Sequence, residues 1–185
     1  MQNPIQSTSM SDKIVKGLSR RQDFDKPQVV FLSLVGNDVC NGHIPTENSF
    51  TSEQVYHDRT ITTLEYLDTI LPAGSSVIIT GLADGGVLWD ILDGRMHPLG
   101  EYRNDIDYPG IYGYLECLEA TPCMGWMSAN ETLREVTTEH ALKLSAVSKN
   151  IVDTESYSHF DMLYYDFDIG PSIELWLGYK MLLVK

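Results

Sequence analysis

The sequence predicts an α/β fold in which a mostly parallel, doubly wound sheet is covered by helices on both faces, giving three layers. Three short apolar runs, at residues 29–35, 76–80 and 160–167, have the length and composition of buried strands. The segments between these runs carry helical periodicities, and strands that alternate with helices form parallel sheets. A chain of 185 residues, of which 43% are hydrophobic, has enough apolar surface for the core of one such domain.

Each predicted helix has a local justification. Thr51-Ser52-Glu53-Gln54 has the spacing of a capping box, which predicts a helix that begins there and ends at Pro72-Ala73-Gly74. Its apolar residues recur at helical intervals and predict one buried face, formed by Val55, Ile61, Leu64, Leu67 (or Tyr66) and Leu71. A second helix is predicted over about residues 137–150, with one apolar side formed by Ala141, Leu144, Val147 and Ile151.

The rest of the chain divides into a lead-in and a long insert. Residues 1–27 are expected to form a peripheral lead-in, in which residues 18–21 end a helix that begins near Asp12. Residues 28–185 are expected to form the folded domain. Within it, residues 87–130 are rich in Gly, Pro, Tyr and Trp and are predicted to be an irregular insert. Loops of that length in a domain are usually functional.

Charge and composition exclude several classes of partner. The chain has 13 basic and 26 acidic residues, a net charge of −13, which argues against binding to nucleic acid or electrostatic docking on anionic membranes. No apolar run approaches the roughly 20 residues of a membrane span. Residues 1–11 lack the apolar segment of a secretory signal peptide, so none is expected in this chain.

The three cysteines leave two interpretations open. Cys117 and Cys123 are close enough in sequence to form a disulfide if the local loop turns back, and Cys40 would then have no partner cysteine in this chain. Alternatively, all three are buried thiols in a reducing compartment. Asn130-Glu131-Thr132 is the chain's one N-glycosylation sequon and is weak support for secretion. No Cys/His spacing predicts a zinc site, and no cofactor or other metal is expected.

Polar loops follow all three predicted strands: Gly36-Asn37-Asp38, Asp84-Gly85 and residues 166–168. The carboxyl ends of parallel strands meet at one edge of the sheet, where open α/β sheets bind their ligands. At that edge the amide of Asn37 could donate a hydrogen bond to the negative charge that develops in acyl transfer. The alternative is that Gly, Asn and Asp only form a turn.

Gly36-Asn37-Asp38 resembles the third signature block of the SGNH (GDSL-type) hydrolases. The longer stretch Gly-Asn-Asp-Val-Cys at residues 36–40 is similar to the acyloxyacyl hydrolase family within that group. Blocks in similar order follow as far as residue 167: Gly81-Leu82 with Asp84-Gly85, Leu88-Trp89-Asp90, His97-Pro98-Leu99-Gly100, Cys117-Leu118, Pro122-Cys123, Gly125-Trp126-Met127-Ser128 and Tyr165-Asp166-Phe167.

This resemblance implies an SGNH-like catalytic domain that hydrolyses carboxylic esters of lipids. The substrate would be the secondary fatty acyl chains of lipopolysaccharide (lipid A), and Asn37 would be an oxyanion-hole donor. The family's nucleophile lies in a Gly-Asp-Ser block and its base in an Asp-x-x-His block. Neither occurs in these 185 residues, so the domain is expected to be incomplete here.

The resemblance also implies a saposin-like segment upstream and a secreted, lysosomal or endosomal location. The alternative is a truncated, non-catalytic relic or a lipid-binding pseudoenzyme.

Four further residues are predicted to face substrate, each with a structural alternative. Gly36 would let substrate approach the backbone closely. Asp84 and Trp89, with Tyr112 and Trp126 nearby in sequence, would wall an acyl-chain pocket or simply pack the insert. His97 would face substrate or order its loop, and pairing with Asp93 as a catalytic base is the less favoured reading. Asp38 is expected to accept hydrogen bonds from backbone N–H groups of the loop and so to fix Asn37.

Overall fold

A computed structural model describes residues 17, 22–33, 36–40, 50–121, 123–172 and 175. The chain divides into two compact units. The first comprises Met1–Asp38, Thr51–Leu82 and Ala141–Phe167, and the second comprises Val39–Phe50, Ala83–His140 and Asp168–Lys185. The helix predicted to end near residues 18–21 lies outside the described residues.

The first unit is built on a parallel sheet of β1 (Val29–Leu32), β2 (Ser75–Thr80) and β3 (Phe160–Tyr165), in the order β1-β2-β3. The register places Phe31 beside Ile78 and Ile78 beside Leu163. The α/β class and the parallel sheet predicted from the sequence are thus confirmed.

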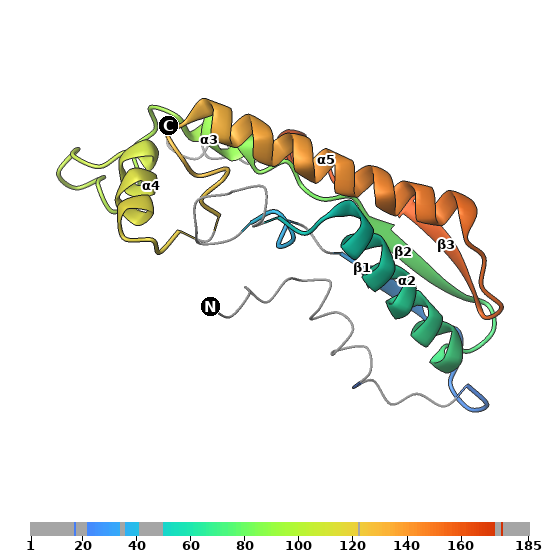
Figure 1. The fold of residues 1–185 in the computed structure, drawn as a ribbon. Coiled ribbons are helices and arrows are strands. Elements are labelled where there is room, and N and C mark those ends of the chain that lie inside the picture. The colour runs from blue at the N-terminus through green and yellow to red at the C-terminus, as the bar shows by residue number, and fades with distance from the viewer. Residues whose placement is uncertain are drawn as a thin grey trace. The chain divides into compact units, whose positions relative to one another are not determined.

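Helix α2 (Glu53–Ile70) connects β1 to β2, and α5 (Glu131–Thr154) is the last helix of the longer connection from β2 to β3 (Figure 1). When successive parallel strands are added in one direction, right-handed crossovers place the connecting helices on the same face. The hydroxyls of Tyr56 in α2 and Ser148 in α5 are both fully buried and lie 2.9 Å apart, as this arrangement requires. Val77 and Ile79 of β2 are completely buried and form the centre of the core.

The opposite face of the sheet carries large apolar side chains that remain exposed. Phe31 is 68% exposed and Leu163 is 57% exposed, and Val29 and Tyr165 are also largely exposed. Since side chains alternate between the faces of a strand, these residues belong to the face opposite Ile79. Within the described residues the sheet is therefore covered on one face, which agrees with an incomplete α/β/α arrangement.

Helix α2 begins close to where the sequence predicts it but with a different cap and a rotated buried face. Ser52, not Thr51, is the N-cap, and its side chain accepts a hydrogen bond from the Val55 N–H. Val55 is 39% exposed because the buried face is centred elsewhere. That face consists of Tyr56, Thr60, Thr63, Leu64 and Leu67. An apolar pattern does not include the two threonines, because threonine carries a polar hydroxyl. Their burial is possible because each hydroxyl donates to a backbone carbonyl one turn earlier.

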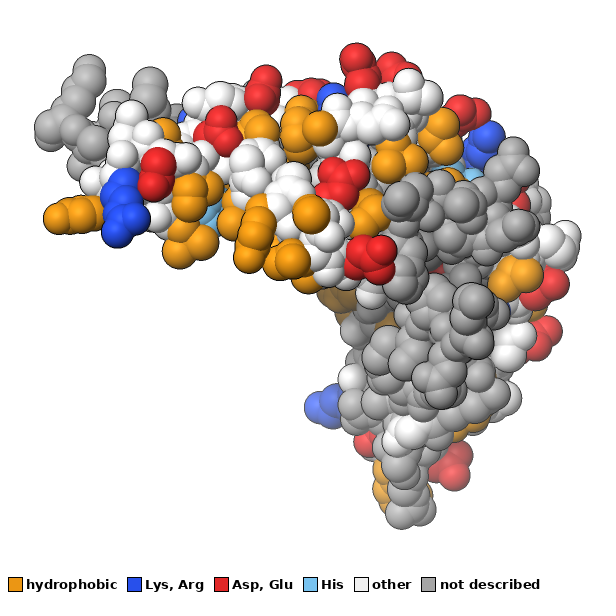
Figure 2. Space-filling model, turned by 60° about the vertical axis from the view of Figure 1, so that its left-hand side comes forward, with side chains coloured by type: hydrophobic (Ala, Val, Ile, Leu, Met, Phe, Trp, Pro, Cys, Tyr) orange, Lys and Arg blue, Asp and Glu red, His pale blue; other side chains and the backbone are white. Residues whose placement is uncertain are grey.

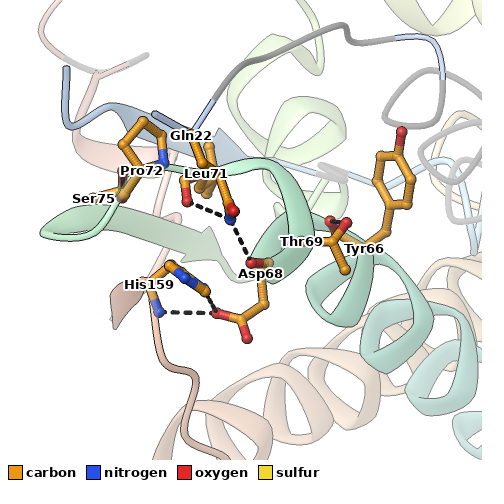
Figure 3. Close-up of polar contacts among 8 residues, drawn as sticks. All are labelled: Gln22, Tyr66, Asp68, Thr69, Leu71, Pro72, Ser75 and His159. Carbon is orange, nitrogen blue, oxygen red and sulfur yellow. Dashed lines mark hydrogen bonds and ion pairs between the residues drawn. The ribbon is translucent and has the colours of Figure 1, made fainter. Parts of the chain in front are cut away.

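A polar cluster secures the end of α2 that lies next to the amino ends of the strands (Figure 3). The Asp68 carboxylate accepts a hydrogen bond from the His159 N–H at 2.9 Å, just before β3. The Gln22 side chain donates to the carbonyls of Asp68 and Leu71, both at 3.0 Å. The chain segments that precede β1 and β3 are thereby fixed to the same helix end.

The second unit contains two helices in the insert that the sequence predicted to be irregular: α3 (Gly86–Leu92) and α4 (Tyr108–Cys117). The irregular structure predicted for this insert was wrong. Helix α4 is rich in Gly and Tyr, as loops often are, but the Asp107 side chain caps its first turn by accepting a hydrogen bond from the Gly110 N–H at 2.7 Å. Helix α5 also extends beyond residues 137–150 at both ends. It starts earlier because Asn130 Oδ1 accepts a hydrogen bond from the Leu133 N–H.

Cys40 and Cys123 form a disulfide within the second unit, and Cys117 is free and exposed. Both sequence-based alternatives for the cysteines were wrong, because Cys117 points to solvent at the end of α4 while the fold brings together cysteines 83 residues apart. Among the described residues, no helix combines the length and apolarity needed to cross a bilayer.

Candidate functional site

The turn that follows β1 holds the residue with the strongest functional prediction. Gly36 and Asp38 are buried, whereas Asn37 between them is exposed. The turn lies at the carboxyl end of a parallel strand, the part of an open α/β sheet where ligands bind. The Asn37 amide is therefore on the accessible side of the turn, with N–H groups able to donate to an anion.

Asp38 fixes this turn through two hydrogen bonds to Thr51. Its carboxylate accepts a hydrogen bond from the Thr51 hydroxyl at 2.8 Å, and its carbonyl accepts from the Thr51 N–H at 3.0 Å. With 2% of its surface exposed, Asp38 has almost no contact with solvent. Both bonds fix the backbone directly after Asn37. The carboxylate does so through a side-chain hydroxyl, whereas the sequence predicted bonds from backbone N–H groups of the loop.

The neighbouring strand ends contribute a second polar group in the first unit. The Tyr164 hydroxyl donates to Asp166 Oδ1 at 3.4 Å, and the Leu82 N–H donates to the buried Ser145 hydroxyl at 2.8 Å. A Cβ on Gly81 would lie 3.1 Å from Asp166 Oδ1 and closer still to the Tyr164 hydroxyl, so a larger residue there would require the Tyr164 side chain to shift. Burial and the charge of Asp166 raise the pKa of Tyr164. Ser145 and Tyr164 were missed because nothing local in the sequence places them at this edge.

In the second unit, Asp84 is the centre of a hydrogen-bond network. Its carboxylate accepts from the Thr138 hydroxyl at 2.7 Å and from the Gly86 N–H at 2.9 Å. The Trp126 indole N–H donates to the same Thr138 hydroxyl at 3.0 Å. The Trp126 ring also covers Gly85, where an added Cβ would lie 2.6 Å from a ring carbon. Asp84 and Trp126 thus hold the start of α3 against α5.

Trp89 lies in a row of ring contacts on the same unit. The Arg134 guanidinium carbon is 4.7 Å from the centre of the Trp89 ring, and the Tyr112 ring centre is 5.8 Å away. Tyr112 continues to Tyr108 and Tyr108 to His97, with ring centres 6.0 and 4.8 Å apart. These contacts favour packing of the insert as the main role of Trp89 and Tyr112.

His97 orders its own loop. Its Nδ1 accepts a hydrogen bond from the Leu99 N–H at 3.2 Å, which assigns the ring proton to Nε2 when the ring is neutral. Asp93 is exposed, and in the described part of the insert no hydrogen bond joins it to His97. Asp93 and His97 therefore do not form an Asp–His pair suited to general base catalysis in the described insert. Gly100 completes the loop, since a Cβ there would lie 2.6 Å from the Ile106 nitrogen.

A cavity of about 220 Å³ lies beside Asp84 in the second unit. Its lining combines one arginine with four carboxylates and few apolar groups: Asp84, Gly86, Val87, Asp90, Glu131, Arg134, Glu135 and Thr138. Acyl-chain pockets are predominantly apolar, so this cavity is poorly suited to hold one. Figure 2 shows acidic side chains scattered among apolar ones on the visible face.

The predicted site residues therefore fall into two sets. Gly36 and Asn37 share one turn of the first unit, whereas Asp84, Trp89 and His97 belong to the second unit and bond to neighbours within it. Asn37 is the member whose surroundings best suit chemistry, because its side chain is exposed and its turn is held by Asp38.

Comparison with known proteins connects this arrangement to a family. No family model matches the chain. Three curated relatives are acyloxyacyl hydrolases: the protein of Mus musculus is 43% identical over 162 residues, that of Oryctolagus cuniculus 43% over 165 residues, and that of Homo sapiens 40% over 164 residues. The alignments cover 88–89% of this chain but 28% of each relative. The resemblance predicted from the motifs is thus confirmed, for a chain that spans about 28% of the length of the relatives it matches.

Proposed function

We propose that this chain, a homologue of the acyloxyacyl hydrolases over 88% of its length, contributes the oxyanion hole of a serine hydrolase that cleaves acyl esters of lipids. One observation carries the proposal: Asn37 is exposed in a turn at the carboxyl end of β1, and the buried Asp38 holds the backbone directly after it. The names of the relatives support the reaction class.

In this reaction a serine oxygen attacks the ester carbonyl, and the carbonyl oxygen becomes negatively charged in the tetrahedral intermediate. An Asn37 N–H donates to that oxygen and stabilises the charge. The intermediate collapses to an acyl-enzyme as the alcohol leaves, and water then releases the fatty acid. The attacking serine and its histidine base are supplied by parts of the protein other than these 185 residues, which contain neither Gly-Asp-Ser nor Asp-x-x-His.

The substrate we propose is the secondary fatty acyl chains of lipopolysaccharide, with phospholipids as a second class of ester. A saposin-like segment of the complete protein would present the lipid, and Gly36 would leave space for it beside the oxyanion. The disulfide between Cys40 and Cys123 supports a secreted, lysosomal or endosomal location, because such bonds persist in oxidising compartments.

Replacement of Asn37 tests the proposal in the complete enzyme. We expect Asn37→Ala to lower kcat about 10²–10³-fold with little change in KM, because one oxyanion donor acts mainly in the transition state. Release of fatty acid from acyl-labelled lipopolysaccharide is the measurement. Asn150→Ala, at an exposed position of α5, is the matched control and should leave kcat unchanged. Unchanged turnover in Asn37→Ala would refute the proposal.

The same assay separates hydrolysis from the alternative of a non-catalytic, lipid-binding relic. That alternative is favoured by the absence of the nucleophile and base blocks from this sequence. A complete protein that binds lipopolysaccharide vesicles but releases no fatty acid would support the relic.

A further inference from the structure

Thr51 connects the turn that holds Asn37 to the start of helix α2. It lies one position before Ser52, the N-cap of α2, and only 1% of its surface is exposed. Its hydroxyl donates to Asp38 Oδ1 at 2.8 Å, and its backbone N–H donates to the Asp38 carbonyl at 3.0 Å. Both groups of Thr51 therefore bond to the residue directly after Asn37.

The first turn of α2 is capped without the Thr51 hydroxyl. Ser52 accepts the capping hydrogen bond from the Val55 N–H at 3.3 Å. The Thr51 side chain bonds instead to Asp38, which lies 13 positions earlier in the chain. This contact is therefore separate from the capping role that the sequence predicted for the segment that Thr51 begins.

The helix start to which the turn is bonded is itself well fixed in the first unit. Tyr56, in the first turns of α2, is fully buried, and its hydroxyl lies 2.9 Å from that of Ser148 in α5. Burial and, to a smaller extent, the charge of Asp38 raise the pKa of Tyr56, so its phenol stays neutral near that carboxylate. Groups held by packed helices keep their positions better than groups held by a loop alone.

We infer that Thr51 is a positioning residue for the reaction proposed above, an inference that rests on Asn37 being the oxyanion donor. The Thr51 hydroxyl holds the buried Asp38 carboxylate, and Asp38 in turn holds the backbone from which the Asn37 side chain extends. Thr51 itself touches no reacting atom. An oxyanion donor must lie about 2.7–3.1 Å from the oxygen that it stabilises, so a small displacement of its turn lowers kcat.

Replacement of the hydroxyl in the complete enzyme tests this role, with release of fatty acid from acyl-labelled lipopolysaccharide as the assay. Thr51→Val keeps the shape and the backbone N–H of Thr51 and removes only the side-chain donor. We expect kcat to fall about 10–10²-fold with little change in KM, because a displaced catalytic group costs up to about 10²-fold in rate. Thr51→Ser restores the donor and should retain most of the wild-type kcat. If Thr51→Val does not fold, Thr51→Ala, which also keeps the backbone N–H, replaces it.

Thr60→Val is the matched control for the loss of a buried threonine hydroxyl from the same helix. Thr60 is 2% exposed, and its hydroxyl donates to the Tyr56 carbonyl at 2.8 Å, within α2. This variant should leave kcat unchanged even if its melting temperature falls. All variants are assayed at a temperature at which each is folded. An equal loss of kcat in Thr60→Val and Thr51→Val would overturn the inference, because it would indicate a general effect of weakening α2.

Combination with Asn37→Ala shows whether Thr51 acts through Asn37. Thr51→Val added to Asn37→Ala should lower kcat no further, because the donor that the hydroxyl positions is already gone. A fall by the same factor in both backgrounds would overturn the inference, as would a wild-type kcat in Thr51→Val. If Asn37→Ala loses turnover and Thr51→Val does not, the role of Thr51 is rejected and the proposed function stands. Unchanged turnover in Asn37→Ala would reject the proposed function and this inference together.

Discussion

Asn37 and Asp38 are adjacent in sequence but face opposite environments, and this difference is what makes the turn useful. Asn37 is exposed, while Asp38 is buried on the hydroxyl and N–H of Thr51. Residue types alone predict the turn, because Gly, Asn and Asp commonly follow strands. They do not predict its anchor, since Thr51 lies outside the local sequence pattern. The same holds for Asp84, whose role depends on Thr138, more than fifty residues away.

Tyr157 provides a residue-scale prediction about stability and pH. Burial, assisted by Glu155, Glu65 and Asp68, raises its pKa from 10.0 to about 12. The neutral phenol is therefore favoured in the folded state, so its contribution is complete below pH 10 and is lost as the pH rises towards 12. We expect the free energy of unfolding, measured by urea titration, to fall over this range.

The comparison of variants isolates this contribution from other groups that titrate at high pH. Tyr157→Phe should reduce the fall in unfolding free energy between pH 10 and 12. Tyr102→Phe is the control, because Tyr102 is 97% exposed and should leave the fall as in the wild type. Equal slopes in all three proteins would contradict the prediction.

At the scale of elements, strands were predicted better than helices, for a physical reason. The strands are short apolar runs, and β1, β2 and β3 all lie within the predicted ones or extend them by one residue. Helix α4 is rich in glycine and tyrosine and is started by the Asp107 cap, so its composition resembles that of a loop. Helix α5 was predicted too short because its first turns are polar and begin at a cap, Asn130, instead of an apolar stripe.

The disulfide is the strongest single connection between distant segments of the second unit. Cys40 and Cys123 are separated by 83 residues, so the bond restricts the unfolded chain substantially. Replacing both with serine should lower the free energy of unfolding by about 2–5 kcal/mol. Urea titration in the absence of reductant measures the change.

Cys117 supplies the internal control, because it is a free and exposed thiol in the same unit. Cys117→Ser should alter the free energy of unfolding by less than about 0.5 kcal/mol. A wild-type protein that shows the same stability with and without reductant would contradict a stabilising role for the Cys40–Cys123 bond.

At the scale of the whole molecule, the sequence predicts the fold class and the edge of the sheet at which the site lies. It does not predict how completely helices cover the two faces of the sheet. The nearly continuous apolar sequences of β1 and β3 are typical of strands that are buried on both faces. The structure covers the face of Ile79 with α2 and α5 and leaves Phe31 and Leu163 exposed on the other. That outcome depends on which elements pack there, and the described segments supply none.

This exposed face leads to a prediction about solubility. Phe31 and Leu163 flank Ile78 in the sheet register and are 68% and 57% exposed, so they form a continuous apolar surface. Such surfaces on strands promote association of partly or fully folded chains.

Phe31→Lys combined with Leu163→Lys should raise the soluble fraction of the 185-residue chain and lower its binding of a hydrophobic dye. Because both side chains are largely solvated, the free energy of unfolding should change by no more than about 0.5 kcal/mol per site. Leu142→Lys, at an equally exposed position of α5 (60%), controls for added charge alone and should have the smaller effect on dye binding. If the double variant instead unfolds while Leu142→Lys does not, the face is buried in solution by a partner, and the interpretation as a free surface is wrong.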